Sequence, residues 1–282
     1  MANGNSIINL GDLSKPVNTL IKKIADAIGV LYEPSRIVKK AKAEAKAEEI
    51  MELNNLKIDV LKKRAINRLI SEEVIKQDNM ENIISKTIPL INNEAKPEAV
   101  DNDWIVYFFE KSRLVSNENM QTLWSKILAG ETNTPGSFSR LTLKIISDLE
   151  KKDADLFTSI ASCTFIIEEP KVMIYWDEMK EVYSRFGIDF NGLTQLDTIG
   201  LIKFNHINGF MKNDIPKNFT VSYFGYPLEI KLHYANTGMY LGNVLLTQTG
   251  SQLLGICGAI PSEEIKNATM LYWRNFGIFN VI

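Results

Sequence analysis

The polar side chains best suited to a chemical site gather around one turn of the chain. Glu131 is followed, after Pro135-Gly136, by Ser137, Ser139 and Arg140. Hydroxyls, a guanidinium and the free N–H groups at a helix start are groups that bind phosphate. Plain helix capping by the serines explains the same residues, and we favour that interpretation.

No other residues form a recognisable reaction centre. The sequence lacks the motifs of a phosphate-binding loop, a nucleophile elbow or a zinc-protease helix. Its two histidines, His206 and His233, are read as polar residues rather than general bases. Cys163 and Cys257 fit no metal-ligand spacing and are read as buried apolar residues. The sequence therefore predicts no catalytic residue, no metal, no cofactor and no enzymatic activity.

The composition is typical of a globular protein, and its charges nearly cancel, so the chain has no strong net electrostatic field. There are 32 Lys and Arg against 34 Asp and Glu, and 45% of the 282 residues are hydrophobic. Near-neutrality gives no global attraction to nucleic acid or anionic lipid, so any such attraction must be local. The first residues lack the features of a secretory signal, which predicts a cytoplasmic protein, with peripheral contact at the inner membrane as an option.

The stretch from Leu232 to Ser262 contains no charged acid or base, which raises the question of a membrane span. A polar block from Thr247 to Gln252 interrupts it. We therefore expect a buried strand followed by a short helix.

The N-terminal segment, residues 1–34, predicts an amphipathic helix with Lys22 and Lys23 on its polar side. Such a helix could lie on a lipid surface or contact another copy of the chain. The expected contact residues are these two lysines and the apolar positions Val17, Leu20, Ile21, Ile24, Ile28 and Leu31.

For residues 35–97 the sequence predicts a long charged helix that ends before Pro89. A short connection follows the helix. Its opening is rich in alanine and charge, so it needs a partner surface for stability. The segment from Arg36 to Glu72 contains ten basic and six acidic residues, a local excess of positive charge. We favour a solvated helix over a nucleic-acid or lipid-phosphate surface.

Residues 98–163 predict a compact helical bundle. Four short amphipathic stretches begin near Asp101, Ser116, Ser137 and Asp153. Their aromatic residues, including Trp104 and Trp124, repeat at helical spacing and are expected in the core rather than in a ligand cage.

Residues 164–282 alternate short helical and strand-like runs, an order that predicts an α+β winged-helix-like domain. The second helical run, 193–202, carries no Lys or Arg, which argues against specific DNA binding. The fold class expected for the whole chain is mainly α, with N-terminal amphipathic and long helices, a central bundle and this C-terminal domain.

Short motifs give the chain a resemblance to a known family. They include Arg-Ala-x-x-Arg and Asn-Met-Glu-x-Ile within 64–83, and Leu-Trp, Leu-Ala and Pro-Gly-Ser-Phe elements within 101–157. With them the chain resembles a bacterial family, domain of unknown function 2806, and is more distantly similar to the Abi-alpha abortive-infection proteins. The resemblance implies a prophage-borne or defence-associated protein and supplies no catalytic residue. The motif positions, expected to be structural, are Trp104, Phe108, Met120, Leu123, Trp124, Gly130, Glu131, Pro135, Gly136, Ser137, Asp153 and Phe157.

The expected function is non-enzymatic anti-phage defence through self-association and contact with a membrane or a partner, such as a phage protein that acts as trigger. The alternatives are a nucleic-acid-binding regulator that uses the winged-helix-like domain, and a scaffold subunit of a larger complex. The premise of the first hypothesis is that the N-terminal helices have no partner within the chain.

Overall fold

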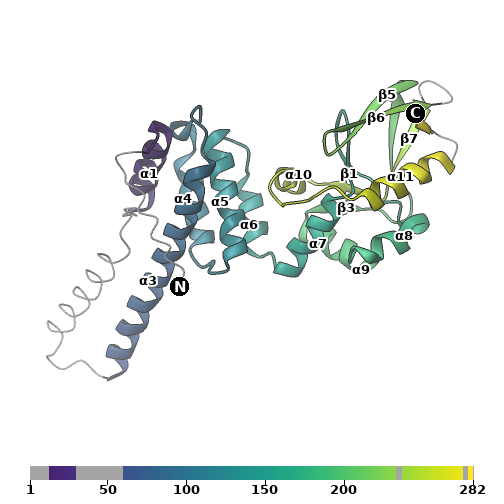
Figure 1. The fold of residues 1–282 in the computed structure, drawn as a ribbon. Helices are drawn as coiled ribbons and strands as arrows, with labels where there is room; N and C mark the ends of the chain where they lie inside the picture. Colours follow the sequence, from purple (N-terminus) through teal and green to yellow (C-terminus); the bar gives the residue numbers. More distant parts are fainter. Residues whose placement is uncertain (1–12, 30–59, 233–236, 276–278, 282) are drawn as a thin grey trace, which may run out of the picture. The chain divides into compact units, whose positions relative to one another are not determined.

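The structure, a computed structural model, describes residues 13–29, 60–232, 237–275 and 279–281 of the chain (Figure 1). The chain divides into two compact units, residues 1–143 and 144–282, each described here by itself. This division differs from the four expected segments, 1–34, 35–97, 98–163 and 164–282. It falls inside helix α6 (Arg140–Ser147), so the residues of the expected bundle are shared between the two units.

The described part of the first unit, residues 13–29 and 60–143, is built from helices. They are α1 (Lys15–Ile28), α3 (Val60–Thr87), α4 (Asn102–Ser112) and α5 (Glu118–Asn133), with the short 3-10 turns η2 (Ile88–Leu90) and η3 (Pro97–Ala99) between α3 and α4. The C-terminal half of α3 packs along α5, and α1 packs on α4 and η3. Ile83, Ile105, Phe108, Trp124 and Leu128 form the buried centre.

Local polar groups set where the central helices begin. The Asp101 carboxylate accepts the N–H of Trp104 at 2.8 Å and caps α4. Helix α5 is capped by Asn117, whose side-chain oxygen accepts the N–H of Met120 at 3.1 Å, and not by Ser116 as expected. Both residue types cap well, so the sequence alone does not separate neighbouring candidates.

The next two helices also begin away from their expected caps. Ser139, rather than Ser137, accepts the N–H of Thr142 at the start of α6. Helix α7 (Lys151–Ala161) follows Glu150, so Asp153 lies within its first turn and is buried. The predicted helices are present, but their starts differ by two or three residues.

The second unit combines, among its described residues, α7 with helices α8 (Trp176–Arg185), α9 (Phe190–Ile199), α10 (Gln248–Leu254) and α11 (Glu263–Asn275) and nine short strands. A five-stranded antiparallel sheet has the order β2-β1-β5-β6-β9. Its strands are β1 (Thr164–Ile167), β2 (Glu169–Val172), β5 (Asn218–Tyr223), β6 (Tyr226–Leu232) and β9 (Phe279–Val281).

Two further antiparallel pairs complete the second unit: β3 (Ile202–Phe204) with β8 (Val244–Leu246), and β4 (Phe210–Ile215) with β7 (Thr237–Gly242). Aromatic residues from β1, β5 and α11 pack together in the core of the second unit. The ring of Phe165 lies 4.6 Å from that of Tyr223 and 5.3 Å from that of Trp273. The indole N–H of Trp273 donates to the Tyr175 hydroxyl at 2.7 Å, which satisfies two buried polar groups.

The prediction of a winged-helix-like domain for residues 164–282 is wrong. The hairpin β5–β6 is central in the larger sheet, with β1 and β2 on one side and β9 on the other. In place of the single buried strand expected within Leu232–Ser262, the chain forms β7 and β8, which are divided at Gly242 (φ +92°) and pair with β4 and β3. Helices account for more of the described residues than strands do, and the strands form small antiparallel sheets.

Candidate functional site

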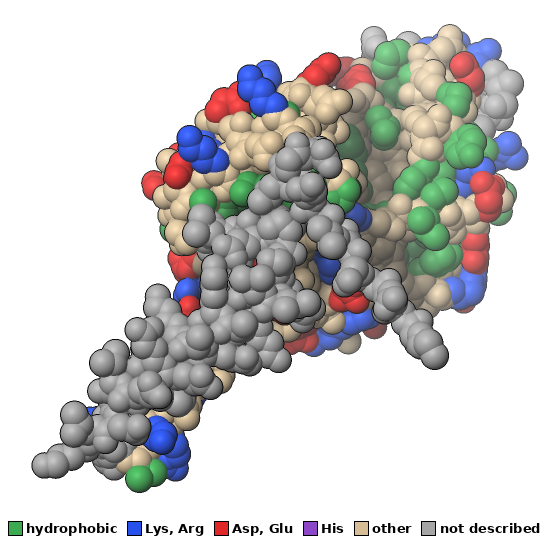
Figure 2. Space-filling view, turned by 60° about the vertical axis from the view of Figure 1, so that its left-hand side comes forward, with side chains coloured by type: hydrophobic (Ala, Val, Ile, Leu, Met, Phe, Trp, Pro, Cys, Tyr) green, Lys and Arg blue, Asp and Glu red, His purple; other side chains and the backbone are tan. Residues whose placement is uncertain are grey.

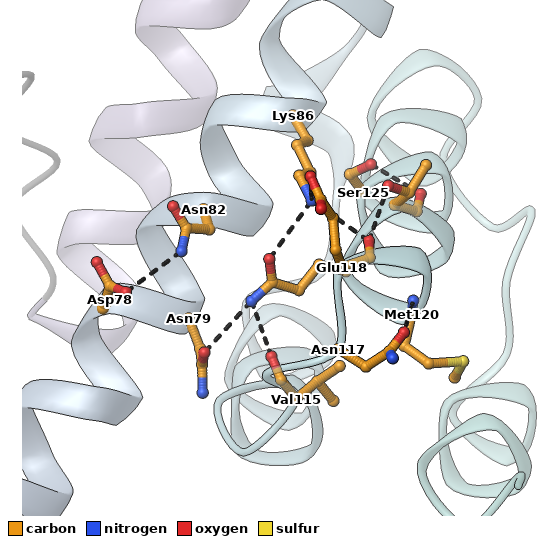
Figure 3. A network of polar contacts seen from close by, with 11 residues as sticks. Asp78, Asn79, Asn82, Lys86, Val115, Asn117, Glu118, Met120 and Ser125 are labelled. Atoms are coloured by element: carbon orange, nitrogen blue, oxygen red, sulfur yellow. Dashed lines mark hydrogen bonds and ion pairs between the residues drawn. The ribbon is translucent and has the colours of Figure 1, made fainter. Parts of the chain in front are cut away.

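A network of polar side chains joins α3 to the loop before α5 and to the first turns of α5 (Figure 3). The side-chain oxygen of Asn79 accepts from Nε2 of Gln121 at 3.3 Å, and the same nitrogen donates to the carbonyl of Val115 at 2.9 Å. Nδ2 of Asn79 donates to the carbonyl of Arg113 at 3.0 Å. Both amides are at most 5% exposed, so these bonds meet the hydrogen-bonding need of buried polar groups.

Lys86 extends this network toward solvent. Its ammonium group donates to the Glu118 carbonyl at 3.3 Å and to Gln121 Oε1 at 3.5 Å, and lies 3.7 Å from the Glu118 carboxylate. The Glu118 side chain is 87% exposed, and ion pairs of this kind stabilise by about 0–1 kcal/mol. The side-chain amides of Asn and Gln do not change protonation state near neutral pH, so the buried part of the network positions helices rather than performing acid–base chemistry.

The turn around Glu131 is closed by its own carboxylate (4% exposed). One oxygen accepts the N–H of Gly136 at 2.7 Å, and the other accepts the N–H of Phe138 at 2.9 Å. The Ser137 hydroxyl donates to the Thr134 carbonyl. Glu131, Ser137 and Ser139 are therefore engaged with the chain itself, and the Arg140 guanidinium lies 3.3 Å from the Asp101 carboxylate. Of the two serines expected to cap the helix, only Ser139 does so.

Two glycines allow the turn to fit against α5. A Cβ added at Gly130 would lie 2.6 Å from Cε2 of Phe138, closer than such atoms approach. Gly136 has φ +89°, a conformation that favours glycine. Pro135 precedes it, half-buried. These motif residues thus shape the turn that Glu131 closes.

The motif tryptophans lie in the core of the first unit. Trp104 stacks on Phe108 at 5.2 Å between ring centroids, and Phe108 meets Trp124 edge-on at 5.1 Å. The indole N–H of Trp104 donates to the carbonyl of Phe138 at 2.7 Å, which connects α4 to the Glu131 turn. Because all three rings are at most 5% exposed, they form part of the core and leave no open cage.

The remaining motif positions do not join this cluster. Met120 and Leu123 lie half-buried on α5. Asp153 and Phe157 are buried on α7, in the second unit. The motif residues therefore stabilise two separate units.

The N-terminal contact residues are placed differently from the expectation. Val17, Leu20 and Ile24 are at most 3% exposed on the α1 face that packs on α4 and η3. Lys23 donates to the Glu98 carbonyl at 2.7 Å. The described chain covers this apolar face itself, so the premise that α1 has no internal partner is wrong. Of the other expected contact residues, Lys22 is exposed, Ile21 and Ile28 are half-buried, and Leu31 lies outside the described residues.

Exposed apolar side chains occur instead on the first half of α3, Val60–Ile75, which we call the exposed half of α3. This part of the helix extends beyond the other helices of its unit (Figure 1). Lys and Arg side chains lie beside hydrophobic ones at its lower end, where α3 begins (Figure 2). The large apolar side chains and their exposed fractions are Val60 71%, Leu61 63%, Leu69 57%, Val74 48% and Ile75 56%. The expected helix segment 35–59 lies outside the described residues.

The reactive side chains considered in the second unit show no catalytic pairing among the residues that the structure covers. Cys163 is buried, and burial raises the pKa of its thiol to about 12, so the thiol stays protonated at neutral pH. Cys257 is only half-buried, which differs from the expectation. The ring of exposed His206 lies 5.3 Å from that of Phe190 and 5.9 Å from that of Phe204. His233 is outside the described residues.

The part of the chain that the structure describes offers neither a metal-ligand cluster nor a membrane-spanning helix. Among these residues, no group of three or more His, Cys, Asp or Glu side chains is arranged to hold a metal ion. No described helix is both long enough and apolar enough to cross a membrane.

Neither the Asn79–Gln121 pair nor the exposure of the first half of α3 was predicted from the sequence. The available signal was their position in the family motifs, because Asn79 begins Asn-Met-Glu-x-Ile and Gln121 lies two residues before the Leu-Trp element. A polar residue on an otherwise apolar helix face, such as Asn79 four residues before Ile83, is the pattern that indicates a buried amide.

Comparison with known proteins gives a family and no activity. No curated protein and no solved structure matches the chain. A family described as a protein of unknown function, DUF2806, matches residues 63–270, which is more than half of the chain. The chain therefore belongs to the DUF2806 family.

Proposed function

We propose that this chain is a non-enzymatic bacterial protein of anti-phage defence that acts through protein contacts made by the exposed half of α3. The observation that carries the proposal is the exposure of five large apolar side chains on this one helical segment. At 3.6 residues per turn, Leu61 and Ile75 lie about 40° apart on one side of this segment, and Val60, Leu69 and Val74 lie on other sides. Large exposed apolar surface on a soluble protein indicates an interaction site.

The contacts of the motif residues support a role without catalysis. Glu131, the only buried carboxylate in the first unit's described core, holds two backbone N–H groups. Asn79 and Gln121 bond to each other and to loop carbonyls. Polar residues that are fully engaged in holding a fold are not free to bind a substrate.

The structure gives no support for membrane contact by α1, because the apolar side of α1 that was predicted to contact lipid is buried against α4 and η3. The proposal therefore keeps the protein partner and drops the lipid surface.

The defence context rests on sequence alone. Its support is the distant similarity to Abi-alpha proteins carried by Leu123-Trp124, Leu128-Ala129 and Pro135–Phe138. In the core of the first unit Trp124 packs against Phe108, and the turn that ends at Phe138 is held by Glu131 and Trp104. In this proposal the unit carries α3 and exposes its first half to a copy of the chain or to a phage protein.

A second candidate is nucleic-acid binding by the start of α3. Lys62, Lys63, Arg64 and Arg68 are all exposed there, whereas Glu72 and Glu73 lie one to two turns further on. This candidate predicts retention of duplex DNA that weakens steeply with added salt. Absence of DNA retardation at low salt would remove it.

The test is a plaque assay with two matched variants. Leu69→Glu places a charge on the exposed half of α3, and Leu271→Glu does the same at an equally exposed leucine, 57% in both cases, on α11. We expect bacteria that produce the wild type or Leu271→Glu to reduce phage plating, and those that produce Leu69→Glu to lose the reduction. Circular dichroism and expression level check that both variants fold.

Two outcomes would contradict the proposal. If the wild type does not reduce plating by any phage in a broad panel, the defence role is wrong. If both variants protect equally well, the exposed half of α3 is not the contact surface.

A further inference from the structure

We infer that the exposed half of α3 binds the same surface of a second copy of this chain, with the two helices antiparallel. The inference deepens the proposed function and rests on its contact surface. It names the partner, the orientation and the residues that meet.

Charge along the helix favours this orientation. The start of the segment carries Lys62, Lys63 and Arg64, and its end carries Glu72 and Glu73. Antiparallel helices place the basic start of one copy beside the acidic end of the other. Parallel helices would place like charges side by side, which is unfavourable.

The apolar and charged residues that would meet lie on one side of α3. At 3.6 residues per turn, Leu61, Arg64, Glu72 and Ile75 fall within about 80° of the helix circumference. A two-fold axis beside Arg68 brings Leu61 opposite Ile75 of the second copy and Arg64 opposite its Glu72. Each contact then occurs twice, as in an isologous interface.

The arginine nearest the axis has a local partner. Arg68 donates to Glu72 of its own helix at 2.9 Å. In the antiparallel pair each Glu72 therefore lies between its own Arg68 and the other copy's Arg64. The negative charge of the two Glu72 side chains offsets the electrostatic repulsion between the two Arg68 side chains near the axis.

The size of the surface predicts a weak complex. At 1.5 Å per residue the exposed half of α3 is about 24 Å long. Two such helices bury less area than a standard stable interface. We expect a dissociation constant on the order of tens of micromolar for the full-length chain.

Charge reversal tests this inference by sedimentation velocity of full-length protein over a range of concentrations. Arg64→Glu and Glu72→Arg each replace two attractive contacts in the dimer by two repulsive ones. We expect each to weaken dimerisation by about tenfold or more. The matched control is Arg274→Glu, which reverses an exposed arginine on α11 and should dimerise like the wild type.

Restoring the charge pairs should restore the dimer. In an equimolar mixture of Arg64→Glu with Glu72→Arg, the two substituted side chains lie opposite each other with opposite charges. The native Glu72 of the first variant likewise lies opposite the native Arg64 of the second, so the mixture should form heterodimers. The double variant Arg64→Glu/Glu72→Arg should form homodimers again. Rescue in both cases separates a contact effect from misfolding.

Three results would overturn the inference: a wild type that stays monomeric at several hundred micromolar, single variants that dimerise like the wild type, or a mixture and double variant without rescue. The first would indicate that residues 30–59 or a different protein cover α3. Loss of plating reduction by Leu69→Glu with no effect of charge reversal on association would reject the dimer and keep the proposed function. Dimers that behave as expected in a protein that gives no plating reduction would reject the proposed function and keep the dimer.

Discussion

The carboxylate of Glu131 holds the backbone of Phe138, seven residues further along the chain, by accepting its N–H at 2.9 Å. Its other oxygen accepts the N–H of Gly136 at 2.7 Å. The carbonyl of Phe138 in turn accepts the indole N–H of Trp104 at 2.7 Å. One carboxylate thus connects the end of α5 to α4 through the turn between α5 and α6.

Replacing Glu131 should destabilise the first unit. Glu131→Ala leaves two N–H groups without their partner, one of them buried, and should lower the free energy of unfolding by about 2–4 kcal/mol. Glu131→Gln keeps one carbonyl acceptor and should cost less. Urea unfolding followed by tryptophan fluorescence measures both, and Glu110→Ala, at a side chain that is 53% exposed, is the control with little expected effect. Equal stability of Glu131→Ala and the control would show that the turn does not depend on this carboxylate.

Gly130→Ala should also be costly, because its Cβ would lie 2.6 Å from Cε2 of the buried Phe138 ring. Forcing a methyl group into this packed contact should lower the free energy of unfolding by about 1–3 kcal/mol. A double-mutant cycle with Phe138→Leu tests the cause, since leucine lacks the clashing atom. The cost of Gly130→Ala should be smaller in the Phe138→Leu background, and an unchanged cost would place the clash elsewhere.

The sequence predicted the helical core of the first unit because apolar spacing reports which side of a helix is buried. Trp104, Phe108 and Trp124 lie in the core as that spacing predicts. The bond from Glu131 to Phe138 was not predictable in the same way. It depends on a chain reversal at Gly136 that brings a backbone N–H group to a side chain on the preceding helix, and periodicity carries no information about such a contact.

The fold of the second unit was predicted less well, for a physical reason. Strands β3, β8 and β9 have three residues each, too few to show an alternating pattern. Strand β2 contains Glu169, Pro170 and Lys171, a composition typical of a protected sheet edge rather than of a recognisable strand. Without these strands, the order of the remaining helical and strand-like runs resembled a winged-helix-like domain, whereas β5 and β6 lie within a larger sheet.

A matched pair of glycines separates backbone conformation from packing in the second unit. Neither Gly225 nor Gly255 has an atom within 4 Å of an added Cβ. Gly225, in the hairpin turn between β5 and β6, has φ +86°, whereas Gly255 has φ −73°. Gly225→Ala should lower the free energy of unfolding by about 1–2 kcal/mol, and Gly255→Ala should raise it by about 0.4–1 kcal/mol. Thermal unfolding measures both, and equal effects would mean that the turn relaxes around the alanine.

The thiol of Cys163 should resist modification in the native protein. Burial raises its pKa to about 12, so almost no thiolate exists at pH 8, and the thiolate is the reactive form. In a Cys257→Ala variant a thiol reagent should therefore label the chain only after unfolding. Rapid labelling of this variant without denaturant would show that the core around Cys163 opens.

The same shift predicts how stability changes with pH. An unfolded cysteine loses its proton near pH 9, whereas folded Cys163 keeps it to about pH 12. The unfolded state therefore binds fewer protons between these values, so the contribution to stability is present below pH 9 and is lost as pH rises. The buried hydroxyls of Tyr175 and Tyr183, whose pKa values burial also raises, act in the same direction at higher pH. Urea unfolding of the wild type and of Cys163→Ala from pH 8 to pH 10.5 separates the contribution of the thiol to the free energy of unfolding. The wild type should lose more stability than the variant over this range. Parallel losses would assign the whole effect to the tyrosines.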